Sequence, residues 1–148
     1  NITNIILSGN KKLEGSLPPL LSSRSLQNLI IEGCSFTGDL PHTITSPLLT
    51  LYLAGNRFTS SIPNLPSSIQ DVSLAYNMIT GKIADSFFLD TPKLKSFDVR
   101  QNKIGGKIPT SLSTLADLKE LKLDLNDFSG AIPPSVKGWP IFATNNTR

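Results

Sequence analysis

The sequence of 148 residues predicts an α/β solenoid, a stack of similar short units whose strands form one parallel β-sheet. Two observations predict this fold. An apolar residue, any residue, an apolar residue, any two residues and then Asn recur six times, 21 to 25 residues apart, with Cys in one copy. The chain also has 11 Pro and 10 Gly, which exclude a helical bundle because an interior Pro costs a helix ~3 kcal/mol.

The first element of each copy is a short strand. Alternating apolar residues predict a strand with one buried face, and a single such strand cannot close a core. Stacking the copies buries the apolar faces of all strands together. The paired apolar positions are Ile5 and Leu7, Leu29 and Ile31, Leu51 and Leu53, Val72 and Leu74, Phe97 and Val99, and Leu121 and Leu123.

The second element is the bend after the strand, where five copies have Asn and one has Cys. An Asn side chain both donates and accepts hydrogen bonds, so it can pair backbone groups that the bend would otherwise bury unsatisfied. We expect these residues to form an internal ladder, with the Cys packed as a small buried group. The ladder residues are Asn10, Cys34, Asn56, Asn77, Asn102 and Asn126.

The third element is a tail that ends in Ile-Pro or Leu-Pro, as in Gly106, Ile108 and Pro109. The Gly permits a tight backbone path, and the Pro ends strand pairing. Two copies depart from the pattern, with Ser60 in place of Gly and Ala84 in place of Pro.

The complete unit, LxxLxLxxNxFxGxIP, is best shown by residues 118–133 and resembles the plant-type leucine-rich repeat. The resemblance implies a right-handed, horseshoe-shaped solenoid with parallel strands on its concave face. It also implies a second short strand near residues 37–40, 3₁₀ turns on the convex face and little α-helix. We expect six repeats over residues 1–136, at about 1–22, 23–45, 46–66, 67–91, 92–115 and 116–136. Residues 137–148 are expected to form a C-terminal cap and tail, with Trp139 and Phe142 as a hydrophobic lid.

The same resemblance implies a non-catalytic ectodomain of a plant receptor-like kinase or receptor-like protein, located outside the cell or at its surface. Its partner would be a peptide or protein ligand or a co-receptor ectodomain, and a polysaccharide is a further possibility. Two alternatives stay open. One is a secreted cell-wall protein or enzyme inhibitor similar to polygalacturonase-inhibiting proteins, and the other is a structural repeat scaffold.

The composition argues against catalysis and several other classes. With His42 and Cys34 as the only residues of their types, we find no catalytic constellation and expect neither a metal nor a cofactor. No apolar run reaches the ~18 residues of a membrane span, and a net charge of +3 is too small to indicate nucleic acid binding. The first strand begins almost at Asn1 without the paired cysteines of a plant-type cap, so we expect the chain to be trimmed from a longer one.

The residues between the apolar positions should face the concave side. Aromatic and Arg side chains often dominate binding energy, which makes the exposed columns a candidate ligand surface. The alternative is that these columns only tolerate whatever residue stands there. The candidate residues are Ile30, Tyr52, Tyr76, Asp98, Arg100, Lys122 and Asp124.

Two further features concern the rim and the ends of the chain. Lys82 and Lys107 occupy the same position in adjacent copies and should form a basic ridge, either a solvated rim or a contact for an anionic partner. Asn1 and Asn145 each begin an N-glycosylation motif, which is typical of secreted proteins.

Overall fold

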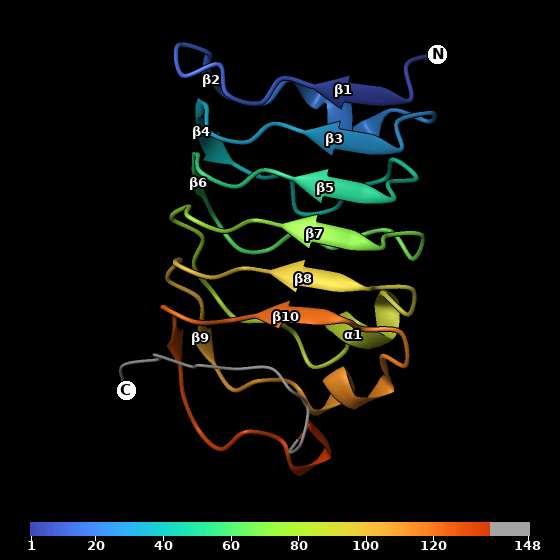
Figure 1. The fold of residues 1–148 in the computed structure, drawn as a ribbon, viewed down its shortest axis with the longest axis vertical. Helices are drawn as coiled ribbons and strands as arrows, with labels where there is room; N and C mark the ends of the chain where they lie inside the picture. Colours follow the sequence, from blue (N-terminus) through green and yellow to red (C-terminus); the bar gives the residue numbers. More distant parts are fainter. Residues whose placement is uncertain (137–148) are drawn as a thin grey trace.

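The computed structural model describes residues 1–136 and contains the solenoid that the repeats predict. Six parallel strands form one sheet in the order β1-β3-β5-β7-β8-β10 (Figure 1). Their bounds are β1 Asn4–Ile6, β3 Asn28–Ile30, β5 Thr50–Tyr52, β7 Asp71–Ser73, β8 Ser96–Asp98 and β10 Glu120–Lys122. Because every strand pairs with the strand of the next copy, the sheet runs the length of the described chain.

The register follows the repeat without slippage. The middle residue of each strand pairs with the middle residue of the next, for example Leu29 with Leu51 and Leu51 with Val72. In β3, β5, β7, β8 and β10 this residue is buried in a single continuous core, whereas Ile5 in the end strand β1 is only partly buried. A one-residue slip would turn the apolar side chains to solvent, so burial fixes the register.

Short strands after the bend form a second row, as the resemblance implies. Three of them pair in parallel, and two more pair near the C-terminal end (Figure 1). They are β2 Glu14–Gly15, β4 Ser35–Asp39 and β6 Arg57–Thr59, and then β9 Gly105–Gly106 and β11 Asp127–Phe128. The strand expected near residues 37–40 is therefore β4, which begins two residues earlier.

The returning segments carry 3₁₀ turns and one short helix. The turns are η1 Pro19–Ser22, η2 Thr110–Thr114 and η3 Pro134–Val136, and the helix is α1 Phe87–Asp90. Phe87 and Phe88 are both buried, with their ring centroids 5.4 and 5.7 Å from that of Phe97. This aromatic cluster attaches the helix to the back of β8.

The ladder residues satisfy backbone groups of two copies at once. Asn77 donates to the carbonyl of Leu74 in its own copy and to that of Leu53 in the preceding copy, at 3.1 and 3.0 Å. Its side-chain oxygen accepts from the backbone N–H of Phe58 at 3.0 Å. Asn56, Asn102 and Asn126 repeat this arrangement.

The ladder is weaker at its N-terminal end. The Cys34 thiol donates to the Leu7 carbonyl at 3.4 Å, where the other copies use an amide. Asn10 is exposed and donates to the Leu7 carbonyl of its own copy. Our expectation of a buried ladder therefore holds for Cys34, Asn56, Asn77 and Asn126, whereas Asn102 is only half-buried and Asn10, in the end copy, is exposed.

The residue before each ladder position has a left-handed backbone. In the first three copies it is a glycine, but in the last three it is Tyr76, Gln101 or Leu125, with φ of 55°, 52° and 55°. A side chain costs roughly 1–2 kcal/mol in this conformation. The solenoid thus imposes backbone strain on three residues that border the concave face.

Candidate ligand-binding surface

The concave face of the six-stranded sheet is formed by strand residues on either side of the buried middle residue. Thr50 and Tyr52, for example, flank the buried Leu51 in β5. Backbone hydrogen bonds between copies continue past the strand ends. The Gly33 N–H, for example, donates to the Ala54 carbonyl. Four of the sequence-predicted residues end a strand and three follow one. The first group is Ile30, Tyr52, Asp98 and Lys122, and the second is Tyr76, Arg100 and Asp124.

The structure brings three of these residues together in one cluster. The Nε atom of Arg100 lies 3.2 Å from Asp98 Oδ2, and its guanidinium carbon lies 5.4 Å from the centre of the Tyr76 ring. Nε has no well-aligned hydrogen bond, so its contact with Asp98 is one of charge. Tyr76 is 47% exposed. The cluster therefore presents an aromatic ring and a guanidinium whose position is already restricted.

Asp98 has a different position from the one expected of a ligand contact. It is buried, and its Oδ1 accepts from the backbone N–H of Arg100 at 3.1 Å. Burial raises the pKa of Asp98, and the hydrogen bond and positive charge of Arg100 only partly offset this effect. Asp98 therefore positions Arg100 instead of forming an open surface.

A second charged cluster lies on β10. Lys122 Nζ is 2.5 Å from Glu120 Oε1, and the Ser96 hydroxyl donates to Glu120 Oε2 at 2.9 Å. These two hydrogen bonds lower the pKa of Glu120. Both side chains of the ion pair are more than a third exposed, so the pair adds little to stability.

Tyr52 occupies the centre of the face and is half-buried. Its pKa is raised first by burial and then by the negative charges of Asp71, Glu32 and Glu120. Burial, and the charge of Asp98, also raise the pKa of Glu32. Tyr52 therefore lies among carboxylates.

Sequence reasoning did not select Glu32, Asp71 or Glu120 as candidate residues. Asp71 and Glu120 begin their strands, and reading the first strand position as a further column would have found them. Two apolar residues, Met78 and Leu125, were also not selected, although they are 38% and 46% exposed. Met78 adds apolar surface in the fourth copy, which also carries Tyr76, and Leu125 adds it in the sixth.

The basic ridge is present as a stack of aliphatic stems. The Lys82 side chain covers the α-carbon of Gly106, where an added Cβ would lie 3.0 Å from Lys82 Cγ. Lys107 covers Gly130 in the same way, at 3.3 Å. Both lysines are exposed. Glycine at these positions lets each lysine stem lie flat on the next copy.

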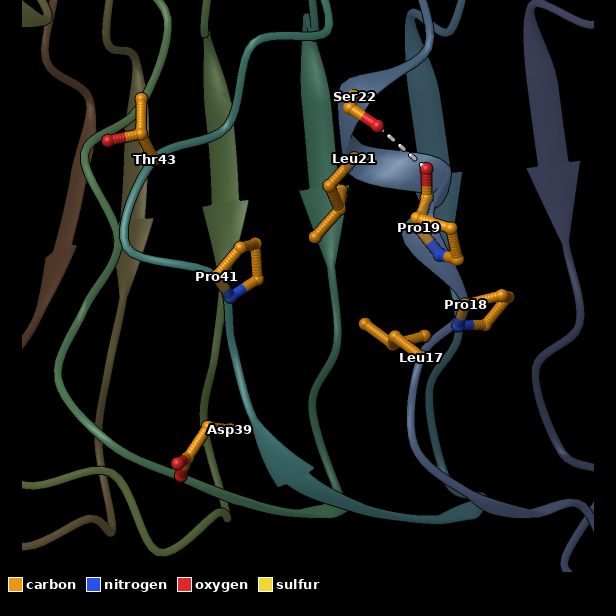
Figure 2. A pocket seen from close by; sticks show the side chains of 8 residues that line it. All are labelled: Leu17, Pro18, Pro19, Leu21, Ser22, Asp39, Pro41 and Thr43. Atoms are coloured by element: carbon orange, nitrogen blue, oxygen red, sulfur yellow. Dashed lines mark hydrogen bonds between the residues drawn. The ribbon is translucent and has the colours of Figure 1, made fainter.

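A hollow of about 240 Å³ lies away from the concave face, between the returning segments of the first two copies (Figure 2). It is mostly apolar, and its one carboxylate, Asp39, accepts from the Thr59 hydroxyl at 2.5 Å. Its lining residues are Leu17, Pro18, Pro19, Leu21, Ser22, Asp39, Pro41 and Thr43. None of the sequence-predicted ligand residues lines it.

Other expectations concern metals, membranes and sugars. Within residues 1–136 no three His, Cys, Asp or Glu side chains are grouped as a metal ion would require. In the same part of the chain, no helix has the length and apolar character needed to cross a membrane. Asn1 is exposed, whereas Asn145, Trp139 and Phe142 lie outside the described residues.

Stacked parallel strands and an internal Asn ladder define a repeat solenoid, here with aromatic and charged side chains on its concave face. The family comparison agrees, because models of the leucine-rich repeat match residues 25–46, 47–69 and 67–128. The chain belongs to the leucine-rich repeat family, in its plant receptor-like form. The fold predicted from the sequence is confirmed.

Relatives and solved structures agree on this class. Receptor-like protein 39 of Arabidopsis thaliana is 36% identical over 126 residues, which are 80% of this chain and 14% of the relative. The ectodomain of the A. thaliana receptor kinase GASSHO1/SCHENGEN3, solved with CASPARIAN STRIP INTEGRITY FACTOR 2, is 26% identical with a TM-score of 0.82. The match covers 92% of this chain and 17% of that ectodomain.

A third similar protein is the ectodomain of the Arabidopsis receptor kinase HAESA, solved with an IDA peptide hormone ligand. It is 27% identical with a TM-score of 0.67, over 89% of this chain and 27% of its own length. The chain thus spans a small part of the proteins it matches, about a seventh in the case of receptor-like protein 39.

Proposed function

We propose that this chain is a non-catalytic recognition module of a plant receptor-like protein or receptor-like kinase, and that it binds a peptide or protein segment across its concave face. The observation that carries the proposal is the cluster of Tyr76, Arg100 and Asp98. A guanidinium held by a buried carboxylate loses less freedom when it binds a partner, so more of its interaction energy contributes to affinity. Aromatic and Arg side chains are also the commonest hot spots at interfaces.

Backbone strain at Tyr76 supports the same site. The first three copies have glycine at this position, where the left-handed conformation is free of strain. Tyr76 has the same conformation and still exposes almost half of its surface. Strained backbone that presents an exposed side chain is typical of functional sites.

The similar proteins support a peptide as the ligand class and an extracellular location. HAESA binds a peptide hormone, and its ectodomain shares the fold of this chain. The glycosylation motif at the exposed Asn1 agrees with secretion. A co-receptor ectodomain is a second candidate for the same surface. The three similar proteins described above give no support to a polysaccharide partner.

A selection experiment tests this proposal without a known ligand. A phage-displayed library of random 12-residue peptides is enriched on the 148-residue chain, and the enriched peptides are then measured against Arg100→Ala and Tyr76→Ala. We expect each variant to weaken binding at least tenfold, equivalent to ~1.4 kcal/mol. Lys93→Ala, at an exposed position between α1 and β8, serves as the control and should bind normally.

Two results decide the outcome. Peptides that bind the wild type and both variants equally would reject the concave site, as the inhibitor and scaffold hypotheses predict. Circular dichroism of the variants must match the wild type, so that lost binding is not lost folding.

A further inference from the structure

The chain itself shows how its concave face holds a cation. Arg100 lies against the Tyr76 ring and the Asp98 carboxylate at the same time. An aromatic face attracts a guanidinium through its quadrupole, and a carboxylate attracts it through charge. An aromatic ring beside a carboxylate is therefore the combination that binds Arg on this surface.

The same combination recurs at Tyr52 with two carboxylates. In the sheet register Tyr52 pairs with Ile30 on β3, and Glu32 follows Ile30 by two residues. On the other side Thr50 pairs with Asp71 on β7. With strands ~4.8 Å apart and ~3.3 Å per residue, each acidic residue lies roughly 8 Å from Tyr52 between α-carbons, on opposite diagonals. Glu32 and Asp71 thus flank Tyr52 on opposite sides in the sheet, and the negative charge of each acts on the Tyr52 hydroxyl.

This second combination has no cation of its own. Within residues 1–136 neither Glu32 nor Asp71 forms an ion pair, whereas Arg100 and Lys122 pair with Asp98 and Glu120. The carboxylates around Tyr52 therefore keep their negative charge available. Tyr52 itself takes part in no cation–π contact in the described part of the chain.

The surroundings leave the ring accessible to an extended segment. After β5 comes the buried Leu53 and then the small Ala54 and Gly55, and the small Gly33 follows β3, so little rises above the sheet beside the ring. The face is also more acidic than the chain. We count the first and last residue of each strand and the residue two positions after it. These positions hold five carboxylates and two cations, while the whole sequence has 11 acidic and 14 basic residues. This charge is complementary to a basic partner.

We propose that Tyr52, Glu32 and Asp71 form a subsite for a cationic side chain, arginine above all, of the peptide that the concave face binds. The inference rests on the proposed function and adds the chemistry of the ligand. A guanidinium can stack flat on the ring while both carboxylates attract it, which a compact ammonium does less well. The ligand would then run from this subsite in the second to fourth copies toward Arg100 in the fifth.

The probe is the capped peptide Ac-Ala-Ala-Arg-Ala-Ala-NH2, titrated into the isotope-labelled 148-residue chain and followed by amide chemical shifts. The matched peptide carries citrulline, which has the shape of Arg without its charge. We expect the Arg peptide to bind about tenfold more tightly and to shift the amides around Tyr52 and Glu32. Raising the salt concentration should weaken the Arg peptide alone.

Protein variants then locate the subsite. Glu32→Gln with Asp71→Asn should weaken the Arg peptide about tenfold, to the level of the citrulline peptide. The control removes two exposed charges elsewhere, with Asp85→Asn just before α1 and Asp90→Asn at its last residue, and should leave binding unchanged. Tyr52→Phe should retain most of the affinity and Tyr52→Leu should lose about threefold, since only Phe keeps the ring.

The outcomes separate this inference from the proposed function. Equal binding of the Arg and citrulline peptides, shifts confined to other residues, no binding at millimolar peptide, or full affinity in the Glu32→Gln, Asp71→Asn variant would each overturn the subsite. If selected peptides still depend on Arg100 while lacking basic residues, the proposed function stands without the subsite. If neither Arg100 nor Glu32 affects binding, both are rejected.

Discussion

Arg100 and Tyr76 come from consecutive copies of the repeat, and the guanidinium carbon of Arg100 lies 5.4 Å from the centre of the Tyr76 ring. The contact joins a residue two positions after β8 to one three positions after β7. It exists because parallel strands in register place equivalent turns side by side. The repeat geometry thus brings side chains that are distant in the sequence into contact.

This pair should be energetically coupled. In a double-mutant cycle with Tyr76→Ala and Arg100→Ala, we expect a coupling of ~0.5–1 kcal/mol in the free energy of unfolding, which is typical of an exposed cation–π contact. Urea denaturation of the four proteins measures it. The cycle of Tyr52→Ala with Arg100→Ala is the control, because these residues lie two strands apart and should be additive. Equal coupling in both cycles would contradict our assignment.

The ladder predicts a large and specific loss of stability at Asn77. Replacing Asn77 by Ala leaves the Phe58 N–H without its buried partner and removes one of the two ladder hydrogen bonds of the Leu53 and Leu74 carbonyls, which still accept from Asn56 and Asn102. The unsatisfied N–H costs ~1–3 kcal/mol and each lost hydrogen bond ~0.5–1.5 kcal/mol, so we expect a loss of at least ~2 kcal/mol in the free energy of unfolding. Thermal and urea unfolding check this value.

Graded controls come from the weaker end of the ladder. Asn10→Ala removes one exposed hydrogen bond, and Cys34→Ala removes weak thiol contacts, so each should cost ~1 kcal/mol or less. Asn64→Ala, at an exposed site, should be within ~0.5 kcal/mol of the wild type. A loss for Asn10→Ala as large as that for Asn77→Ala would show that ladder position, and not burial, sets the cost.

The strands and the ladder were predictable because their signal is repeated. Alternating apolar residues identify the buried face of each strand, and the recurring Asn marks each bend. The register then follows, since only one alignment of the copies buries residues such as Leu51 and Phe97 together.

The candidate site was only partly predictable. The sequence places Asp98 in an exposed column, yet the structure buries it, because Arg100 and Lys122 lie on or beside it. The carboxylates around Tyr52 come from three strands and different columns, so no single column reveals their grouping. Contacts across strands depend on side-chain size and charge in neighbouring copies, which a pattern of apolar positions does not contain.

The left-handed turns predict unequal effects for two glycines. Gly33 and Gly55 have φ of 62° and 67°, so Ala is strained at both sites. An added Cβ meets nothing within 4 Å at Gly33, but at Gly55 it lies 3.4 Å from the Gly33 backbone. We expect Gly33→Ala to cost ~1 kcal/mol in the free energy of unfolding, and Gly55→Ala to cost more. A lower cost for Gly55→Ala than for Gly33→Ala in urea denaturation would contradict this prediction.

Asp98 should give the stability of the chain an unusual pH dependence. Its pKa is raised from the ordinary 3.8, mainly by burial, so the native state binds a proton more readily than the unfolded state. The stabilisation that Asp98 gives is then complete below the unfolded pKa and is lost as the pH rises through the native pKa. Asp98→Asn removes this titration and keeps an oxygen for the Arg100 N–H. Relative to the wild type, this variant should therefore become more stable as the pH rises.

Glu120 provides a control of opposite sign. Hydrogen bonds from Lys122 and Ser96 lower its pKa from 4.5, so its stabilisation is present above the unfolded pKa and is lost as the pH falls through the native pKa. Glu120→Gln should therefore become less stable relative to the wild type as the pH rises. Urea unfolding of the three proteins between about pH 3 and 7 yields the two difference curves, in which titrations shared with the wild type largely cancel. Asp98 also interacts with the charges of Arg100, Lys122, Glu120 and Glu32, which are present in both the wild type and the Asp98→Asn variant. Because the pKa of Asp98 is raised and that of Glu120 is lowered, we expect the two difference curves to have slopes of opposite sign. Slopes of the same sign would show that burial does not control the protonation of Asp98.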